Sequence, residues 1–301
     1  MSPLNESTSR EHALPLAVVT VTYSPGAYLD RFLTSLAAAT DRETLTVLAD
    51  NGSRDGVPER AGKRPGVTFL PTGGNVGYGG GMNAGERYLR AARNRGEVGA
   101  DYLLLSNPDV EFTPGSIDAL IDCLERHPEA AAAGPRIVEP DGSTYPSARE
   151  VPTLRDGIGH AVFSRLWPQN PWTARYRRGE DMDTERTAGW LSGSCLLLRW
   201  DAFAAIGGFD ERYFMYLEDV DLGDRLQRAG YANVYCPAAR ISHAQGHSTK
   251  AHAGPMLKAH HASAYRFQAD RHPKWWQAPL RWALRAGLKA RLVLERLAGS
   301  R

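Results

Sequence analysis

The chain has few cysteines, three among 301 residues, and no apolar run of membrane-spanning length. Cys123, Cys195 and Cys236 are odd in number, widely spaced and set among apolar residues, which is typical of reduced core thiols rather than of a disulfide framework. The first residues are polar and lack the apolar segment of a signal peptide, so we expect residues 1–13 to form a frayed tail. These absences predict a cytoplasmic protein that does not span a bilayer.

Internal repeats, zinc-finger motifs and RNA-binding motifs are also missing, so we expect no nucleic-acid partner. Residues 73–85 include seven glycines but contain neither a Walker loop nor a G-x-G-x-x-G fingerprint. This glycine-rich run predicts a backbone that bends sharply or comes very close to a ligand. The hydrophobic content of 42% and the length of 301 residues are sufficient for a sizeable globular core.

The N-terminal half predicts a sheet whose strands end in polar turns. Apolar runs at 16–23 and 45–49 flank a helical pattern at 29–36, and strand, helix and strand in this order form a βαβ unit. Such sheets bind ligands at the carboxyl ends of their strands. Residues 50–56, with the sequence DNGSRDG, follow the second strand and could read a nucleobase and ribose, or form an ordinary Asn-Gly turn.

A further strand at 101–106 ends in Asn107, Pro108 and Asp109, where the proline stops the strand ladder. A carboxylate beside an amide carbonyl suits a hard divalent cation that also binds a diphosphate, and the alternative is a plain strand-end turn. After it we expect a helix at 114–126, capped by Thr113, and a strand at 130–138.

Residues 207–221, GGFDERYFMYLEDVD, join a glycine pair to three acids within four residues. Helical spacing follows and ends at Gly230, so Glu218 and Asp219 are expected at a helix N-terminus. Crowded carboxylates raise one another's pKa, which suits a general base near neutral pH. The alternative is that acids simply favour helix N-termini.

Two histidines four residues apart, His243 and His247, would share one face of a helix and suit zinc. Gly246 and the strand expected at 233–236 favour a loop instead. A structural histidine is the alternative reading of His243.

The middle and the end of the chain leave more than one interpretation. Residues 139–187 lack clean periodicity and are read either as an acceptor-binding lid or as a surface loop. Trp190 stands beside small residues and either stacks on a sugar or fills the core.

Residues 271–301 contain eight Lys or Arg and one Glu, a local charge of +7. This tail has a tryptophan pair, Trp275 and Trp276, and leucines at every fourth position from Leu280 to Leu292. A basic stripe flanks the leucines, formed by Arg281, Arg285 and Lys289. We expect an amphipathic helix lying on an anionic membrane surface. The alternatives are a helix packed on its own domain or on another subunit of a homo-oligomer.

Taken in order over about residues 14–250, these motifs resemble the inverting GT-A glycosyltransferases of family 2. The matching segments are Val18 to Tyr23, Asp50 to Asp55, Gly74 to Gly77, Asn83 to Gly85, Asn107 to Asp109, Gly193-Ser194, Gly207 to Glu211, Glu218 to Asp221 and His243. Within that family the chain is most similar to bacterial rhamnosyltransferases, including those that add L-rhamnose to N-acetylglucosaminyl-diphospho-decaprenol. The resemblance implies an α/β GT-A fold, a Rossmann-like mixed sheet flanked by helices.

We accordingly divide the chain into four parts. Residues 1–13 are the polar tail, 14–115 the nucleotide-sugar-binding half, and 116–255 the acceptor-binding and catalytic half. Residues 256–301 form a helical region that ends in the basic amphipathic helix and serves as a membrane-surface anchor.

The resemblance also implies residue roles. The nucleoside is expected on Thr22, Asp50, Asn51, Ser53 and Asp55, and the donor pocket is expected to include Asn75, Gly77 and Asn83. Asp109 and His243 would hold Mg²⁺ or Mn²⁺. Asn107 stands where the first acid of the metal motif is usual, and an amide oxygen without charge makes metal binding weaker. Asp219, with Glu218 beside it, would take the proton from the attacking acceptor hydroxyl.

The expected reaction moves L-rhamnose from dTDP-L-rhamnose to a polyprenyl-diphosphate-linked GlcNAc acceptor, in cell-wall or surface polysaccharide synthesis at the inner face of the cell membrane. One alternative is a related transferase that uses a UDP-hexose on a different glycan, since nothing in the sequence separates dTDP from UDP. Another is a non-catalytic sugar-nucleotide-binding scaffold, against which the joint presence of Asp109, Glu218, Asp219 and His243 argues.

Overall fold

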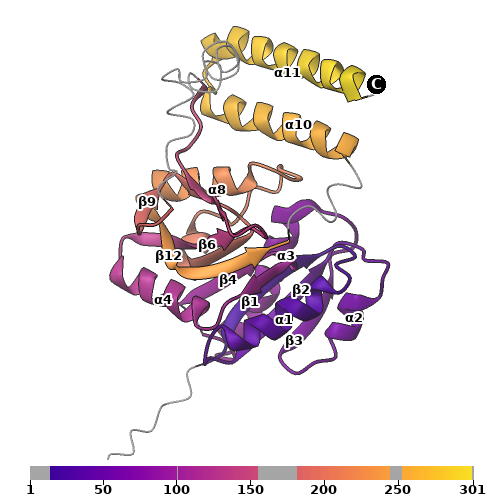
Figure 1. Cartoon of the computed structure of the whole chain (residues 1–301). Helices are drawn as coiled ribbons and strands as arrows, with labels where there is room; N and C mark the ends of the chain where they lie inside the picture. Colours follow the sequence, from indigo (N-terminus) through magenta and orange to yellow (C-terminus); the bar gives the residue numbers. More distant parts are fainter. Residues whose placement is uncertain (1–13, 100, 155–181, 245–252, 300–301) are drawn as a thin grey trace, which may run out of the picture.

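The computed structural model describes residues 14–99, 101–154, 182–244 and 253–299 (Figure 1). A central mixed sheet runs in the order β3-β2-β1-β4-β11-β6-β12-β5, with β7 beside β6 and β9 beside β12. Its strands are β1 (Leu16–Thr22), β2 (Thr44–Asp50), β3 (Val67–Pro71), β4 (Tyr102–Ser106), β5 (Val110–Phe112), β6 (Ala130–Val138), β7 (Thr144–Tyr145), β9 (Arg186–Ala188), β11 (Cys195–Arg199) and β12 (Ala232–His243). A separate two-stranded sheet pairs β8 (Ala148–Arg149) with β10 (Trp190–Leu191).

The helices are α1 (Tyr28–Ala38), α2 (Val57–Ala61), α3 (Gly77–Asn94), α4 (Ser116–Arg126), α7 (Trp200–Ala205), α8 (Glu218–Arg228), α10 (Ala253–Arg271) and α11 (Ala278–Gly299), with a 3-10 turn, η1 (Trp275–Gln277), before α11. Among the predictions, the tail at 1–13, the stretch 155–181 of the middle segment and His247 lie outside the described residues.

The predicted βαβ unit is confirmed. β1 pairs in parallel with both β2 and β4, and β2 pairs in parallel with β3. In this register Thr22 lies beside Asp50, so the carboxyl ends of the strands meet at one edge of the sheet. β11 then pairs antiparallel with β4, which makes the sheet mixed.

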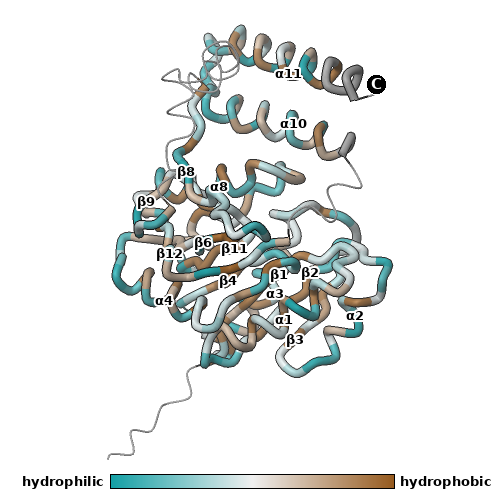
Figure 2. The backbone as a smooth tube through the Cα atoms, viewed as in Figure 1, coloured by the Kyte–Doolittle hydropathy of each residue, from teal (hydrophilic) through white to brown (hydrophobic). Residues whose placement is uncertain are grey.

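Two apolar clusters fill the two faces of the sheet, because alternate strand residues point to opposite sides. Val18 and Leu48 belong to the cluster that includes the buried residues of α1 and α4. Val19 and Val47 belong to the cluster that includes buried residues of α3, α7 and α8. Figure 2 shows these strands in brown between helices of mixed colour. The sheet is therefore covered on both faces, and its polar strand ends are left for the site.

The glycine-rich run supplies both a bend and the start of a helix. Gly73, Gly74 and Gly77 have positive φ and turn the chain after β3. Gly79 and Gly81 already belong to α3, and a Cβ there would come within 2.8 Å of Phe209 and 2.7 Å of Val21. In α3 the backbone therefore comes close to side chains of the protein's own core. The sequence alone could not distinguish this from close approach to a ligand.

Two predicted boundaries are wrong for one physical reason, pairing with a distant strand. α4 begins at Ser116 after a left-handed Gly115, whereas Thr113 donates from its hydroxyl to the Arg240 carbonyl at 2.9 Å. The strand expected at 233–236 continues through an irregularity to His243, where it pairs with β5 and β6. A long-range partner replaced the local cap and the local loop that the sequence favoured.

The last two helices, α10 and α11, form a hairpin above the body (Figure 1). Phe267 of α10 is buried with Tyr213 and Val220, and the Ser263 hydroxyl donates to the Met215 carbonyl at 2.9 Å. The four leucines of α11 predicted to share a face are half-buried, on the side where α11 packs on α10. In the described part of the chain no helix combines the length and apolar character needed to cross a membrane.

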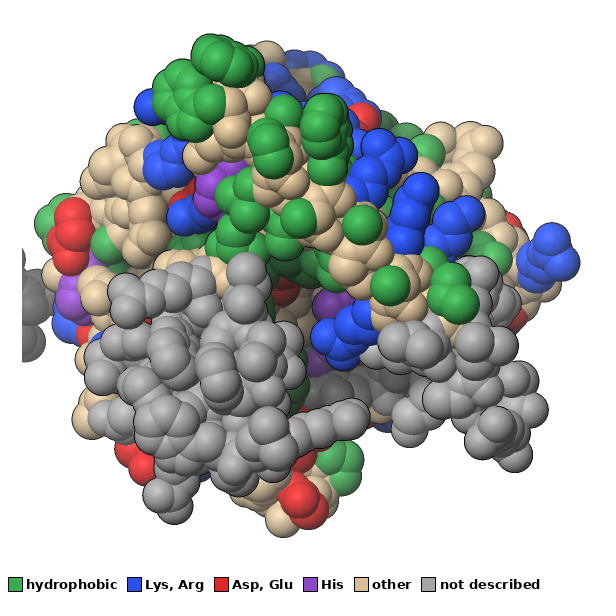
Figure 3. Space-filling model, turned by 90° about the horizontal axis from the view of Figure 1, so that it is seen from above, with side chains coloured by type: hydrophobic (Ala, Val, Ile, Leu, Met, Phe, Trp, Pro, Cys, Tyr) green, Lys and Arg blue, Asp and Glu red, His purple; other side chains and the backbone are tan. Residues whose placement is uncertain are grey.

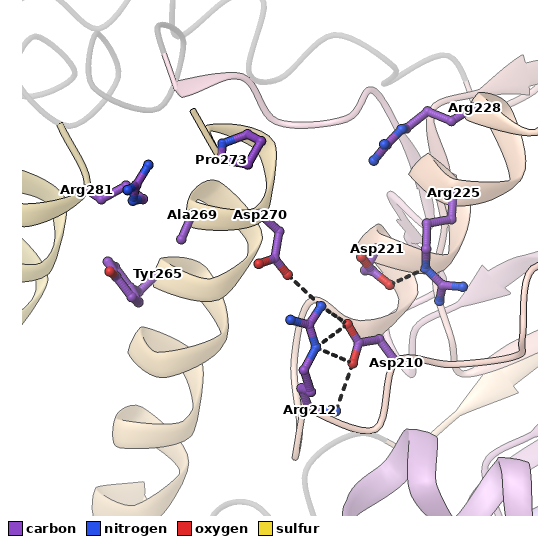
Figure 4. Close-up of a pocket in the computed structure, with 10 residues that line it drawn as sticks. All are labelled: Asp210, Arg212, Asp221, Arg225, Arg228, Tyr265, Ala269, Asp270, Pro273 and Arg281. Atoms are coloured by element: carbon purple, nitrogen blue, oxygen red, sulfur yellow. Dashed lines mark hydrogen bonds and ion pairs between the residues drawn. The ribbon is translucent and has the colours of Figure 1, made fainter. Parts of the chain in front are cut away.

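Ion pairs join the hairpin to the body. A pocket of about 560 Å³ lies between α8 and α10 and is lined mostly by charged side chains (Figure 4). Arg212 bridges Asp210 and Asp270, the second at 2.7 Å, and Arg271 of α10 reaches Asp224 of α8 at 2.6 Å. The hairpin is thus attached through α8 and the loop before it, the segment that carries the predicted base.

Candidate active site

The Asp50 turn gathers most of the predicted nucleoside residues. Asp50 is buried, and its carboxylate accepts hydrogen bonds from the hydroxyls of Thr22, at 2.7 Å, and Ser53. The backbone N–H groups of Gly52 and Ser53 also donate to it, at 3.0 and 2.9 Å. Asp55 accepts from the Gly26 and Val57 N–H groups at 2.9 and 3.0 Å. These acids fix the shape of the turn, so a nucleoside would meet a preformed surface rather than free carboxylates.

Asn51 links that turn to the glycine-rich bend. Its amide donates to the Gly77 carbonyl at 3.0 Å and lies 3.4 Å from the Asn75 side-chain oxygen. Asn75 in turn accepts the Gly77 N–H at 3.1 Å. The three predicted residues are therefore brought together at the edge where β2 and β3 end.

Asn83 lies deeper, nearly two turns into α3. It donates to the Phe209 carbonyl at 2.9 Å and accepts the Phe209 N–H at 2.9 Å. It also donates to Glu211 at 3.1 Å. Asn83 thus ties α3 to the loop that precedes α8, and both ends of its amide are already bonded within the protein.

A second group brings together Asn107, Asp109 and His243. His243 Nε2 lies 3.1 Å from Asp109 Oδ1 and 3.2 Å from the Asn107 amide nitrogen. The strand end of β4 carries the first two residues, and β12 carries His243. A carboxylate, an imidazole and an amide, which can turn its oxygen inward, form a donor set that suits Mg²⁺ or Mn²⁺. The residues present fit such an ion.

The acid pair lies at the start of α8, after a strained turn. Tyr216 and Leu217 have φ of 68° and 63°, a left-handed backbone that costs roughly 1–3 kcal/mol per non-glycine residue. Glu218 is buried and its Oε2 has no hydrogen-bond partner among the described residues. Asp219 is only half-buried, and it accepts the N–H groups of Gly193 at 3.0 Å and Val220 at 2.9 Å.

Burial and the Asp219 charge raise the pKa of Glu218 to about 8. Burial also raises the pKa of Asp219, while the two backbone N–H groups oppose that rise. Two backbone N–H groups favour a charged Asp219, whereas Glu218 Oε2 has no partner among the described residues, so the hydrogen bonds favour placing the negative charge of the pair on Asp219. Of the two, only the ionised and partly exposed Asp219 is suited to accept a proton from a substrate.

Tyr78 was not predicted as a site residue. Its hydroxyl donates to the Gly193 carbonyl, and the N–H of the same glycine donates to Asp219. Burial raises the pKa of Tyr78 well above its usual value, and the charges of Glu218, Asp219 and Asp109 raise it further. Tyr78 therefore lies near both the acid pair and Asp109. A tyrosine inside the glycine-rich run was the available signal, but its partner is 115 positions away.

A family model described as Glycosyl transferase family 2 matches residues 17–207. The chain is 54% identical over 279 residues to the N-acetylglucosaminyl-diphospho-decaprenol L-rhamnosyltransferase of Mycobacterium tuberculosis, covering 92% of this chain and 91% of that protein. It is 25% identical over 253 residues to Rhamnosyltransferase WbbL of Escherichia coli K12, covering 84% of this chain and 92% of that protein. The acid pair and His243 lie beyond the part that the family model matches.

Solved structures are similar in fold at low identity. The crystal structure of GalNAc-T7 with UDP, GalNAc and Mn²⁺ has a TM-score of 0.53 and 16% identity over 77% of this chain, which spans 44% of that chain. The structure of Staphylococcus aureus TarS 1–349 has a TM-score of 0.51 and 15% identity, covering 94% of this chain and 82% of that one. The predicted GT-A architecture is confirmed at the level of the fold.

Proposed function

The chain belongs to glycosyl transferase family 2 and is a glycosyltransferase, and on that premise we propose that it moves L-rhamnose from dTDP-L-rhamnose to a polyprenyl-diphosphate-linked GlcNAc. The names of two relatives, both rhamnosyltransferases, support this donor sugar. The observation that carries a catalytic role is Asp219, half-buried and held by two backbone N–H groups beside a buried Glu218.

Asp219 acts as the general base. The acceptor hydroxyl gives its proton to the Asp219 carboxylate while its oxygen forms a bond to the anomeric carbon. The bond from that carbon to the diphosphate oxygen breaks on the opposite side, so the configuration inverts and the nucleoside diphosphate leaves with the electron pair. Glu218 stays protonated and adds no second negative charge next to the base.

The donor lies along the carboxyl ends of β1, β2 and β4. The Asp50 turn, with Thr22, Asn51, Ser53 and Asp55, supports the nucleoside, and the bend at Asn75 and Gly77 borders the sugar nucleotide; Asn83 holds the neighbouring loop in place. Asp109 and His243, with Asn107, would hold Mg²⁺ or Mn²⁺. Such an ion supplies positive charge that stabilises the departing diphosphate.

The hairpin gives the enzyme a surface for its lipid-linked acceptor. Trp275 and Trp282 are 82% and 69% exposed, and Figure 3, which looks down on the hairpin, shows green and blue side chains gathered there. Arg285 and Lys289 are exposed on the same helix. Exposed tryptophans and basic residues together suit the interface of an anionic membrane, and we place the enzyme at the inner face of the cell membrane.

Donor screening tests this function directly. The full-length protein is given a GlcNAc-diphosphate-polyprenyl acceptor and each nucleotide sugar in turn, and release of the nucleoside diphosphate is measured. We expect acceptor-dependent release with dTDP-L-rhamnose. Release only with a UDP-hexose would establish the alternative transferase. Donor binding without release for every nucleotide sugar would support the non-catalytic scaffold and overturn the proposal.

A further inference from the structure

A cluster of metal-ligating side chains lies in the body, apart from the donor turns. Cys123 of α4, Cys236 of β12 and Glu185, just before β9, each offer one ligand atom, and these atoms all lie within 4.8 Å of one another. Cys236 precedes His243 by seven strand positions, roughly 20 Å at the rise of a strand. The cluster is thus too far from the Asp109 group to share an ion with it.

The distances between these ligand atoms suit a tetrahedrally coordinated cation. In a tetrahedral site, metal–oxygen and metal–sulfur bonds of about 2.0–2.3 Å place neighbouring ligand atoms roughly 3.3–3.8 Å apart. The side chains of the cluster would need to move only slightly inward to reach these separations. His127, four residues after Cys123, lies at the C-terminal end of α4 and places its Nε2 2.9 Å from Glu185 Oε1. Two thiols and a carboxylate therefore approach one another from three separate segments of the chain, and the His127 imidazole lies beside the carboxylate.

The charges around the cluster also favour a divalent cation. Once both thiols lose their protons to a bound cation, the two thiolates and the Glu185 carboxylate would carry −3, and Arg126 lies 2.6 Å from the other Glu185 oxygen. Arg126 and a divalent cation together would balance that charge.

We propose that Cys123, Cys236, Glu185 and His127 bind a thiophilic divalent cation of the zinc class as a structural site. Thiolate and imidazole ligands select such a cation, and four protein ligands leave no open position for a reaction. The ion would fasten the start of β9 and the end of α4 to β12. β9 also pairs with β12 and leads through β10 to Gly193, so the site would secure the segment that positions the predicted base.

Cobalt substitution tests the site in the full-length, reduced protein. The purified protein is first assayed for zinc, then stripped with a chelator and titrated with Co²⁺ alone. We expect about one equivalent of zinc as isolated, and a thiolate-to-cobalt charge-transfer band on titration. Cobalt bound by Asp109 and His243 gives no such band, because that site has no sulfur.

Variants assign the ligands. Cys123→Ser with Cys236→Ser should abolish the band, and Glu185→Gln or His127→Gln should weaken binding by about 10-fold or more. Cys195→Ala is the matched control, because Cys195 is also buried but lies on β11, and it should keep the band. The proposal is overturned if the wild-type protein shows neither zinc nor the band, if the double variant keeps the band, or if in-cell alkylation finds Cys123 and Cys236 joined as a disulfide.

Discussion

The body and the C-terminal hairpin of this glycosyltransferase bury their residues differently. In the body, strands such as β1 and β4 are almost fully covered, and the polar side chains at their ends are fixed by hydrogen bonds to distant segments. In the hairpin, the largest apolar side chains face outward, with Trp275 82% exposed and Trp282 69% exposed. Among the described residues it is attached by Phe267, by Ser263, by the ring of His260 against Tyr216, and by ion pairs such as Arg271–Asp224.

On the function proposed above, this difference separates two tasks. Transfer chemistry requires carboxylates held in one geometry with shifted pKa values, which only a packed body provides. Membrane docking requires exposed tryptophans and basic side chains, which a packed body would cover. Changes in the body should therefore alter turnover on every acceptor, and changes on the outer face of the hairpin should alter only reactions at a membrane.

The largest expected effect is that of Asp219→Asn. We expect turnover to fall by about 10²-fold or more on both soluble and membrane-bound acceptors, with donor affinity nearly unchanged, because the amide cannot accept the proton. Initial rates and donor binding are measured side by side. Asp221→Asn is the matched control, since Asp221 lies in the same acid cluster but pairs with Arg225 at 2.6 Å. Turnover within a few-fold of wild type would remove Asp219 from the mechanism.

Asp109→Ala should weaken donor binding by roughly 10- to 100-fold, again for either acceptor, because the diphosphate loses the charge of a bound ion. EDTA should suppress the wild-type activity, and added Mg²⁺ or Mn²⁺ should restore it. Glu111→Gln, in an exposed pair with Arg31, serves as the control. Full activity after exhaustive chelation would contradict the metal site.

The hairpin should respond in the opposite way. Replacing Arg285 and Lys289 with Gln should weaken binding to anionic vesicles by about 30-fold, from about 1 kcal/mol per basic residue, and added salt should weaken the wild type similarly. Arg281 is left intact because it donates to the His272 and Lys274 carbonyls and so holds the junction. Rates on a short, water-soluble acceptor should not change. Equal loss on both acceptors would mean that the hairpin belongs to the catalytic fold.

Tyr78→Phe tests how the body holds its base. The hydrogen bond to the Gly193 carbonyl is lost, so the N–H of that glycine should hold Asp219 less firmly, and turnover should fall by about 10-fold. The acid limb of the pH–rate profile should move to higher pH, because weaker donation from Gly193 raises the pKa of Asp219. A lower rate with an unmoved limb would indicate a structural role only.

The smallest effect on activity is expected from Glu218→Gln. Since the pKa of Glu218 is raised to about 8, the wild-type side chain is mostly protonated at pH 7, and the variant should turn over within about 3-fold of wild type there. Wild-type stability should fall as pH rises from about 4.5 towards 8, because the unfolded chain releases this proton first. The variant lacks that loss and should melt higher than wild type at pH 8. Equal melting at pH 8 would refute the raised pKa.

Much of the fold was predictable because it depends on local patterns. The strand at 130–138 was predicted with the bounds that β6 has, and the four apolar residues of α1 expected on one face are all buried. The candidate site residues were predicted from separate short segments of the sequence. The structure brings them together in the groups around Asp50, Asp109 and Asp219. Their assigned roles stay predictions. The cap at Thr113 and the end of β12 were wrong because each depends on a partner more than a hundred residues away.

By itself, the sequence determined the alternation of strands and helices, the polar turns at the strand ends, the acid cluster and the basic tail, because periodicity and turn chemistry act over a few residues. Only the tertiary structure decided which of these polar groups meet. It set Tyr78 against Gly193 and thereby Asp219, buried Glu218 beside a half-exposed Asp219, and brought Cys123 and Cys236 together with Glu185. Such contacts depend on how the elements pack, because burial and the proximity of charges exist only in the folded chain.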